Sequence, residues 1–297
     1  MTLERCIPLL FVLIWSTGFV VARLIAPYTD PLTFLSYRYL ASVLAFVGIA
    51  MAAGATWPST PGAWARGLVA GVLLQGVYLG GVFWAVRHGL PAGIAALVVG
   101  LQPLLTALLA FPLLGERVGL RKWLGILLGF GGALIVLEPR IAAGINGVTL
   151  APLAAVILAM AGITIGTIWQ KRTAAAADIR TNAAVQFIGA AVVTLPVALV
   201  TETGRFEPVW QAWVGLAWSV LGLSVGAISL LLFMIRRGSV ASVASLFYLV
   251  PPVVAIEAWL LFGEALGLSQ IAGMLVAAIG VAVASRQPRR ARQHISE

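Results

Sequence analysis

Long apolar runs, separated by short segments rich in proline, glycine and charge, leave this chain few ways to fold. They predict spans at residues 6–26, 32–54, 65–86, 91–114, 119–138, 149–170, 180–201, 212–235, 239–262 and 267–285. As helices rising about 1.5 Å per residue, such runs can cross about 30 Å of hydrocarbon. Lipid offers the backbone no hydrogen-bond partners, so a helix, which satisfies its own, is favoured. The sequence therefore predicts an all-α integral membrane protein with ten transmembrane helices.

The composition leaves little material for anything outside the membrane. Of 297 residues, 61% are hydrophobic and 10% are charged, which is too few charges to cover a water-soluble protein of this size. Ten spans of about 22 residues would use roughly 220 residues. The remainder suffices for short loops, so a sizeable soluble domain on either face is excluded.

The formal net charge of +9 raises the question of a nucleic-acid partner. The basic residues, however, stand singly and in pairs between apolar runs, and they form no basic face of the kind that nucleic-acid binding needs. We therefore expect no nucleic-acid partner. The expected partners are membrane lipid and a small-molecule substrate.

Lysine and arginine are distributed unequally between the two sides that ten spans would create. If the N-terminus lies inside, the outer side holds five of the 19 basic residues, namely Arg23, Arg38, Arg87, Arg140 and Arg205. Cytoplasmic loops are enriched in basic residues, so both termini are predicted to be cytoplasmic. The expected location is the cell (inner) membrane, as a multi-pass protein whose residues 287–297 form a basic cytoplasmic tail.

The chain repeats itself at a spacing of about 148 residues. Several positions recur at that spacing: Pro103 and Pro251, Gly115-Glu116 and Gly263-Glu264, Gly125 and Gly273, and Gly132 and Gly280. The expected repeats are 1–144, holding helices 1–5, and 145–286, holding helices 6–10. Because five is odd, the second copy must enter the membrane from the opposite face. Inverted five-helix repeats of this kind are a device of secondary transporters.

A family resemblance rests on a motif that occurs twice: a proline in the fourth helix, then Gly-Glu, then a glycine-rich fifth helix. It stands as Pro103…Gly115-Glu116…Gly125…Gly132 and as Pro251…Gly263-Glu264…Gly273…Gly280. The chain resembles EamA-type members of the drug/metabolite transporter superfamily, and among them it looks most like amino acid exporters, including YddG-type exporters of aromatic amino acids. The resemblance implies a basket-like bundle. The first four helices of each repeat would line a central cavity, with the fifth outside.

Glu257 is the costliest residue to place in lipid, since it lies inside the ninth predicted span. A bare carboxylate there costs several kcal/mol, so it should be paired, protonated or in contact with water. One interpretation is a substrate-ammonium or proton site. The other is a structural ion pair with Arg38, which lies at similar depth in the second predicted span. The residues leave both interpretations open.

Polar and aromatic side chains inside the spans are the expected cavity lining: Trp15, Ser16, Thr17, Tyr39, Gln75, Tyr78, Trp84, Gln102, Thr164, Thr167, Trp169, Gln186, Ser224, Ser229, Ser245 and Tyr248. The first candidates for substrate binding are Gln75, Tyr78, Trp84, Trp169, Tyr248 and Glu257. Amide and hydroxyl groups can hold a zwitterion, while aromatic rings stack on an apolar side chain. The alternative role is hydrogen bonding between helices, worth about 0.6 kcal/mol each.

Pro103 and Pro251 lie inside predicted spans, where each removes a backbone donor and favours a kink. They are candidate hinges for a conformational change, or else fixed packing features. The pairs Gly115-Glu116 and Gly263-Glu264 stand at span ends, where glycine ends one helix and glutamate caps the next. We interpret these pairs as structural rather than catalytic.

No residue pattern points to a catalytic or metal site. His88 and His294 are the two histidines of the chain, so no zinc cluster is expected. A glycine-rich phosphate loop and a nucleophile elbow are also missing from the sequence. The sequence thus predicts no enzyme, no catalytic residue, no metal and no cofactor.

The expected function is a secondary transporter that exports small neutral metabolites by alternating access through a central cavity. Amino acids, including aromatic ones, are the foremost substrates. Two complete repeats can enclose such a path in one chain, so a monomer suffices. A drug or nucleotide-sugar transporter of the same fold, and a channel, stay open as alternatives. Binding of an anionic nucleotide sugar would require several intramembrane basic residues, and Arg38 is the one available within the spans.

Overall fold

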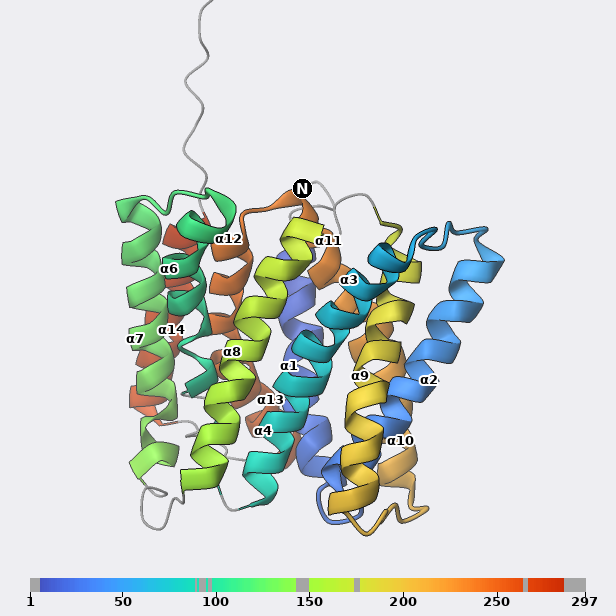
Figure 1. Cartoon of the computed structure of the whole chain (residues 1–297). Coiled ribbons are helices and arrows are strands. Elements are labelled where there is room, and N and C mark those ends of the chain that lie inside the picture. The colour runs from blue at the N-terminus through green and yellow to red at the C-terminus, as the bar shows by residue number, and fades with distance from the viewer. Residues whose placement is uncertain are drawn as a thin grey trace, which may run out of the picture.

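Figure 1 shows a bundle of helices that run between two opposite faces. This computed structural model describes residues 6–88, 90, 95, 98–142, 150–173, 177–263 and 267–285. Within those ranges the named elements are all helical, and one isolated antiparallel bridge joins Thr29 to Phe206. Seven helical stretches there are long and apolar enough to cross a membrane, and two shorter helices are also apolar. The predicted all-α membrane class is therefore confirmed, while ten crossings stay a prediction.

In the first half, the described helices begin and end close to the predicted spans. They are α1 (Ile7–Ile25), α2 (Pro31–Ala52), α3 (Pro61–Gly71), η2 (Val72–Val77), α4 (Tyr78–Arg87), α6 (Gln102–Leu114) and α7 (Leu120–Ala142). Proline stands in the first turn of α1, α2, α3 and α6. There its missing N–H needs no partner, and its fixed φ suits a helix start.

The second half repeats this order. It consists of α8 (Leu150–Thr173), α9 (Ile179–Thr201), α10 (Trp210–Trp218), η3 (Ser219–Ile228), α11 (Ser229–Arg237), α12 (Val240–Ser245), η4 (Leu246–Leu249), α13 (Val250–Phe262) and α14 (Leu268–Ser285). In both halves the third crossing, α3–η2–α4 or α10–η3–α11, contains a π-helical segment near its middle. π-Helical turns inside α-helices are often found at functional sites.

The fourth crossing of each half is interrupted, which corrects the continuous helices predicted over 91–114 and 239–262. Part of the first range, including 91–94, lies outside the described residues, but a turn at Gly100–Leu101 precedes α6. In the second half, the 3₁₀-helix η4 separates α12 from α13. Pro103 and Pro251 stand in the first turns of α6 and α13. Proline has no N–H to give to a preceding turn, so each proline opens a helix instead of kinking one.

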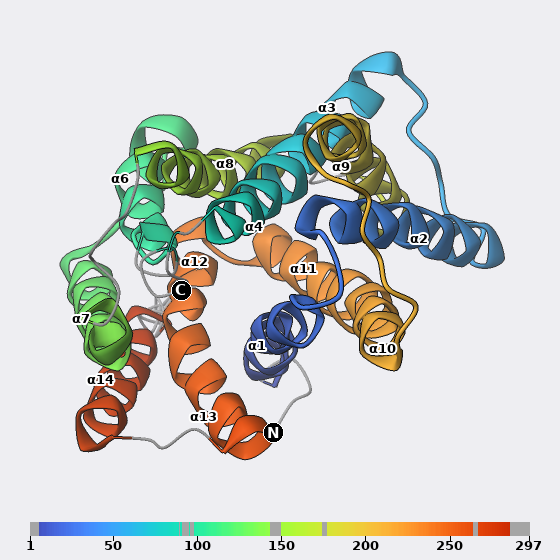
Figure 2. The ribbon, with the colours of Figure 1, turned by 90° about the horizontal axis from the view of Figure 1, so that it is seen from below.

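The two halves pack against each other through matching pairs of contacts. α7 lies along α14, and α2 lies along α9, so the fifth and second helices meet their own counterparts. α1 packs on η3 as α8 packs on η2, and α1 packs on α13 as α8 packs on α6. Figure 2 shows α7 and α14 together at one edge of the bundle, with α2 toward the opposite edge. Each of these contacts made by a helix of the first half thus has a counterpart made by the corresponding helix of the second half. This is expected if the two halves are copies of one structural unit.

Glycine makes the α7–α14 contact possible. A Cβ atom added at Gly280 would overlap the backbone nitrogen of Gly129 and lie 2.7 Å from the carbonyl oxygen of Gly125. A Cβ atom added at Gly273 would lie 2.8 Å from the carbonyl oxygen of Gly132. Small residues let helix backbones approach closely, and such packing drives helix association in lipid. The glycine-rich fifth helices therefore hold the two halves together at the edge of the bundle.

Glycine also ends the fourth crossing of each half, as predicted. Gly115 follows α6 with a φ of 69°, and Gly263 follows α13 with a φ of 66°. These left-handed conformations carry no Cβ penalty in glycine and are common at helix C-termini.

The glutamate that follows Gly115 has a different partner from the predicted one. Glu116 Oε2 accepts a hydrogen bond of 3.2 Å from the backbone N–H of Val240, at the start of α12. It therefore caps a helix of the second half rather than the next helix of its own half. Its counterpart Glu264 lies outside the described residues, as do much of the boundary between the predicted repeats 1–144 and 145–286 and the predicted tail 287–297.

The charged residues gather at the two ends of the bundle, and the basic excess is at one of them. One end, here called the basic face, is where α3, α7 and α9 begin and where α6, α8 and α11 end (Figure 1). These helix ends and the turns beside them carry Arg66, Arg117, Arg121, Lys122, Lys171, Arg172, Arg180, Arg236 and Arg237. Hydrogen bonds join its segments: Lys122 Nζ donates to Ser239 Oγ (2.8 Å), and Lys171 Nζ donates to the carbonyl oxygen of Gly238 (2.7 Å). The other end, here called the acidic face, holds most of the described acidic residues, namely Asp30, Glu138, Glu202 and Glu207, beside Arg23, Arg87, Arg205 and the position of Arg140 near the end of α7.

On the acidic face, the start of α2 is clasped to the loop after α9. The Glu202 carboxylate accepts hydrogen bonds from the backbone N–H groups of Leu32 (2.8 Å) and Thr33 (2.7 Å) and from the Thr33 hydroxyl (2.8 Å). Asp30 accepts a further hydrogen bond from the Thr203 hydroxyl (2.8 Å). The unpaired N–H groups of the first turn of α2 are thus satisfied by a carboxylate, whose charge also suits the positive end of the helix dipole.

We expect Glu202→Gln to lower the free energy of unfolding by about 1–3 kcal/mol, because charge-assisted bonds to α2 are lost or weakened. Thermal unfolding of the detergent-solubilised protein measures the change. Glu207→Gln is the matched control, since Glu207 pairs with Arg205 at an exposed site, where such pairs contribute little. Equal Tm values for the two variants would contradict the role assigned to Glu202.

Candidate functional site

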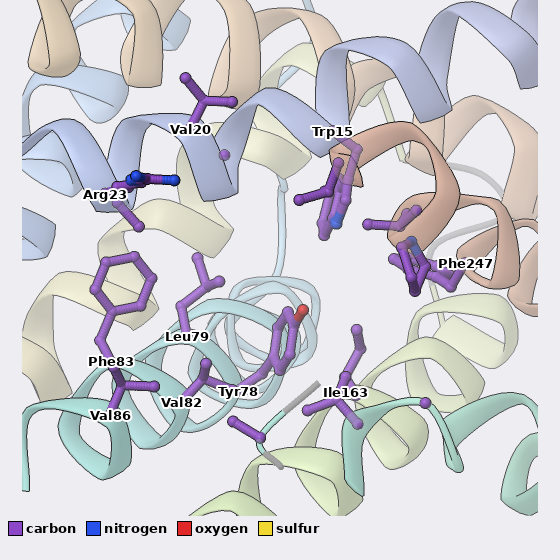
Figure 3. A pocket seen from close by; sticks show the side chains of 18 of the residues that line it. Trp15, Val20, Arg23, Tyr78, Leu79, Val82, Phe83, Val86, Ile163 and Phe247 are labelled. Carbon is purple, nitrogen blue, oxygen red and sulfur yellow. The ribbon is translucent and has the colours of Figure 1, made fainter. Parts of the chain in front are cut away.

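A cavity of about 470 Å³ lies between the two halves, and both halves contribute to its wall. The lining comes from α1, the start of α2, α4, α6, α7, α8, η3, η4 and α13. In Figure 3, Trp15 and Phe247 stand at one end, Tyr78 lies between, and Arg23 and Phe83 lie toward the other end. This volume suits a small ligand, and most of the lining is apolar, as is usual for small-molecule sites.

Aromatic rings close the end of the cavity that points to the basic face. Trp15 and Phe247 meet edge to face, with ring centroids 5.3 Å apart. Phe11 packs behind both, at 5.2 Å from Trp15 and 5.6 Å from Phe247. Such edge contacts between rings are favourable beyond the area they bury. The three rings therefore form a packed floor across the path, contributed by α1 and η4.

The other end of the cavity lies toward the acidic face. Arg23, Ala26 and Arg87 line it there, and all three residues are exposed. Pro31, at the start of α2, belongs to the same rim. The lining thus reaches exposed residues at the acidic face, and the packed rings of Trp15 and Phe247 lie at its opposite end.

Asp30, next to this rim, stays ionised at neutral pH. Burial raises the pKa of its carboxyl, but hydrogen bonds from the Thr203 hydroxyl and from the backbone N–H groups of Arg205 and Thr203, with the charge of Arg87, outweigh burial. The net pKa lies below the ordinary value of 3.8. A lowered pKa contributes stability that is present above the unfolded-state pKa and is lost as pH falls through the folded-state pKa. The clasp on α2 is therefore intact at neutral pH.

Arg38, on α2, is the buried charge of the cavity. Its side chain lines the cavity although the residue is only 7% exposed. The Nε atom donates a hydrogen bond of 3.1 Å to Ser224 Oγ, in the π-helical segment η3. The neighbouring Tyr39 hydroxyl donates to the carbonyl oxygen of Gln75, in the other π-helical segment η2, at 3.0 Å. Two consecutive residues of α2 therefore tie the irregular third crossings of both halves to the cavity wall.

Tyr78 and Tyr248, two of the first candidates from the sequence, line the cavity. The Tyr248 hydroxyl is buried and finds no partner among the described residues. Among the wider candidates, Trp15 and Gln102 also line it. These four side chains come from α1, α4, η4 and α6. As predicted, they lie on separate helices and line one cavity.

Three other first candidates lie away from the lining. The backbone carbonyl oxygen of Gln75 accepts the hydrogen bond from the Tyr39 hydroxyl. Trp84 stacks on His88 with ring centroids 3.9 Å apart. Trp169 donates its ring N–H to the carbonyl oxygen of Arg66 (2.9 Å), near the basic face. Trp84 and Trp169 thus have structural partners, whereas the buried Oε1 of the Gln75 side chain has no hydrogen-bond partner among the described residues.

Glu257 and Arg38 are not brought together. Arg38 binds Ser224, whereas Glu257 Oε2 is buried and has no hydrogen-bond partner among the described residues. Glu257 is also missing from the described lining of the cavity. The predicted ion pair between these residues is therefore not formed in this conformation. Their similar depth, inferred from the sequence, did not reveal that α2 and α13 turn the two charges toward different surroundings.

Phe83, Phe130 and Phe247 line the cavity as well. They carry no polar atom, so nothing in the sequence distinguishes Phe83 and Phe130 from lipid-facing phenylalanines. Phe247 had one available signal, since it precedes Tyr248 at the interrupted fourth crossing. Within the described part of the chain, no group of three His, Cys, Asp or Glu side chains comes together.

Comparison with known proteins gives a consistent result. The EamA-like transporter family matches the chain twice, over residues 5–138 and 150–286. The uncharacterized transporter YvbV of Bacillus subtilis is 28% identical over 278 residues, covering 89% of this chain and 86% of that protein. The uncharacterized inner membrane transporter YedA of Escherichia coli is 26% identical over 275 residues, covering 91% and 85%. These relatives do not single out the YddG-type aromatic exporters.

Two further similarities are more limited. A probable amino-acid metabolite efflux pump of Salmonella typhimurium is 30% identical over 139 residues, or 47% of this chain and 43% of that protein. A solved crystal structure covers 94% of this chain and 96% of its own, with a TM-score of 0.80 at 20% identity, which speaks for the fold. The twofold family match spans both halves that enclose the cavity. The chain belongs to the EamA-like transporter family and is a multi-pass membrane transporter of small metabolites.

Proposed function

We propose that the chain is a secondary transporter that exports amino acids, aromatic ones included, by alternating access. The observation that carries this proposal is the cavity between the halves, whose lining reaches exposed residues at one face and ends at the packed rings of Trp15, Phe11 and Phe247. We infer that it is open toward the first face and closed toward the second. A path closed at one end and wide enough for a metabolite suits a carrier better than a channel. The aromatic rings around it favour substrates with apolar or aromatic side chains.

The basic face is proposed to be cytoplasmic. The cytoplasmic side of a membrane protein is enriched in lysine and arginine, and the basic face carries most of the described lysines and arginines. The cavity then opens to the outside, and the conformation is outward-open. Both chain termini would be cytoplasmic in the same arrangement.

The two halves are proposed to be inverted repeats that exchange roles during transport. The matching contacts between halves support this, and so do the directions of the helices after the two breaks. α6 runs from the cavity toward the basic face, where Glu116 meets α12, whereas α13 runs from the cavity toward the acidic face. Inverted repeats with broken helices at the substrate site are typical of alternating access. The helix starts at Pro103 and Pro251 are the proposed hinges.

Closing the outside and opening the inside would then require the contacts of the basic face to separate. The hydrogen bonds of Lys122 with Ser239 and of Glu116 with Val240 join the first half to the second there. Those of Trp169 with the Arg66 carbonyl oxygen and of Thr181 with the Thr56 carbonyl oxygen do so as well. They are few and peripheral, as a reversible closure needs. The rings of Trp15 and Phe247 would part in the same step.

Flux into proteoliposomes tests the proposal. Purified protein should carry labelled aromatic amino acids at a rate that saturates with concentration, with and without a pH gradient. Saturation distinguishes a carrier from a channel, because a carrier handles a limited number of molecules per cycle. Linear, unsaturated flux or unitary currents would contradict the carrier mechanism. Saturable flux that excludes all amino acids would contradict the substrate assignment.

A further inference from the structure

The charges around the cavity are all of one sign in the described lining. Arg23, Arg38 and Arg87 line it, and no aspartate or glutamate does. Arg23 and Arg87 stand at the exposed rim, whereas Arg38 lies deeper and is buried. A cargo without a carboxylate or other anionic group would not explain why a membrane protein keeps a guanidinium at this depth, where unpaired charge is costly.

The acidic residues of the described chain lie outside the cavity lining. Glu257, on α13, has a buried Oε2 without a hydrogen-bond partner among the described residues, whereas several others are occupied elsewhere. The sequence contains no Asp or Glu between Asp30 and Glu116, so α2, α3, α4 and α6 supply none. Asp30 and Glu202 belong to the clasp on the acidic face, and Glu116 caps α12 on the basic face. Asp178 is paired with Arg180. A substrate ammonium group therefore finds no carboxylate in the described wall of this cavity.

Arg38 is held in place but not neutralised. Its one hydrogen bond to a side chain among the described residues runs from Nε to the neutral Ser224 hydroxyl. A guanidinium has five N–H donors in a fixed fork, so donors on its terminal nitrogens stay available to the cavity. That fork fits the two oxygens of a carboxylate. The bond to Ser224 fixes the plane of the group in advance, which lowers the entropic cost of binding.

Two helix starts add to the same electrostatic preference. α6 and α13 both begin at the cavity, where Gln102 and Pro251 line it. Each is 13 residues long, and the N-terminus of a helix carries a partial positive charge. Together with Arg38, these ends give the interior of the cavity a positive potential that favours an anionic group over a cationic one.

We propose that Arg38 binds the carboxylate of the substrate and that the cavity needs no ammonium group on it. The substrate class is then small aromatic carboxylates, in which an amino acid is one member and its deaminated analogue another. The aromatic ring of the substrate would lie against Trp15, Tyr78 and Phe247, with the carboxylate toward Arg38. This inference rests on the transport function proposed above and narrows its chemistry.

A set of matched ligands tests the inference on the full-length protein in lipid nanodiscs. Isothermal titration calorimetry would compare L-phenylalanine with 3-phenylpropanoate, which lacks the ammonium group, and with 2-phenylethylamine, which lacks the carboxylate. We expect 3-phenylpropanoate to bind at least as tightly as phenylalanine, and the amine to bind at least tenfold more weakly. An amine that binds as well as the two acids would overturn the inference, and so would a failure of 3-phenylpropanoate to bind.

Substitution of Arg38 then locates the effect. Arg38→Gln should raise the Kd of 3-phenylpropanoate at least tenfold while leaving the Kd of the uncharged 3-phenylpropanamide unchanged. Arg38→Lys, which keeps the charge but loses the fork, should restore part of the affinity, and it serves if Arg38→Gln fails to fold. Arg121→Gln, at an exposed position on the basic face, is the charge-matched control. Equal weakening of the acid and the amide would mean that Arg38 is structural, and would overturn the inference.

The outcomes separate this inference from the proposed function. Saturable amino acid flux combined with tight binding of 2-phenylethylamine would support the carrier function. It would contradict the inference that Arg38 selects substrates by their carboxylate. Tight, Arg38-dependent binding of 3-phenylpropanoate without amino acid flux would support the inference about Arg38. It would contradict the proposal that amino acids are transported.

Discussion

A Gly280→Ala variant is expected to lose roughly 1–3 kcal/mol of stability or more, the cost of overpacking a closely fitted interface. The added methyl group would overlap the backbone of Gly129, on the facing helix α7, and backbone cannot rotate away as a side chain can. α7 and α14 would have to separate along their length, which removes the packing that holds helices together in lipid. The measurement is the Tm of the purified protein, together with its recovery as a monodisperse species.

Gly131→Ala provides the matched control on the same helix pair. Gly131 lies on α7, but a Cβ atom added there meets nothing within 4 Å. Alanine favours a helix over glycine by about 0.5–1 kcal/mol, so this variant should be as stable as the parent or slightly more so. Opposite signs for the two changes would identify close packing as the cause. If both variants lose stability, any added methyl group on this helix pair would be destabilising. Close packing at Gly280 would then not explain the effect of Gly280→Ala.

A single cysteine in the cavity should make transport almost completely sensitive to a thiol reagent. Val82 lines the cavity between Tyr78 and Val86 (Figure 3). Cys6, the native cysteine, is exposed, so Cys6→Ser supplies the background. We expect Val82→Cys in that background to react with a membrane-impermeant methanethiosulfonate added outside intact cells. The attached group would fill much of a cavity of about 470 Å³, and flux should fall nearly to zero.

Thr201→Cys is the control for that experiment. Thr201 is exposed at the end of α9, on the acidic face and outside the cavity lining. It should react at a similar rate without loss of flux. If Val82→Cys reacts only after the cells are opened, the cavity faces the cytoplasm and the proposed orientation is wrong. Full reaction without inhibition would mean that the cavity is not the transport path.

The arginine-lined cavity changes the chemistry expected from the sequence. One intramembrane arginine, Arg38, was visible within the spans, and few charges suggested a neutral cargo. In the structure, Arg23 and Arg87 join Arg38 around the cavity, because α1 and α4 end at the same rim as the start of α2. Distance along the chain gives no hint of this convergence. The proposed cargo therefore carries an anionic group, and its overall neutrality matters less.

The candidate site was foreseen in part, and the division has a physical pattern. Tyr78 and Tyr248 combine a ring with a hydroxyl, so their place inside an apolar run already indicated a special environment. Trp84 and Trp169 gave the same signal, but their ring and N–H groups are used by His88 and by the Arg66 carbonyl oxygen. A polar aromatic residue in a span must find a partner, yet sequence does not tell whether that partner is a substrate or a neighbouring helix.

The amino acid sequence alone determined the helical membrane class, the positions of most helix ends and the presence of two related halves. Hydrocarbon thickness and backbone hydrogen bonding act on each segment by itself, so those features can be read locally. Only the tertiary structure decided that α7 pairs with α14, that Glu116 caps a helix of the other half, and that Arg38 meets Ser224 rather than Glu257. These contacts join residues far apart in the chain, and they depend on helix rotation and tilt, which packing between neighbours sets.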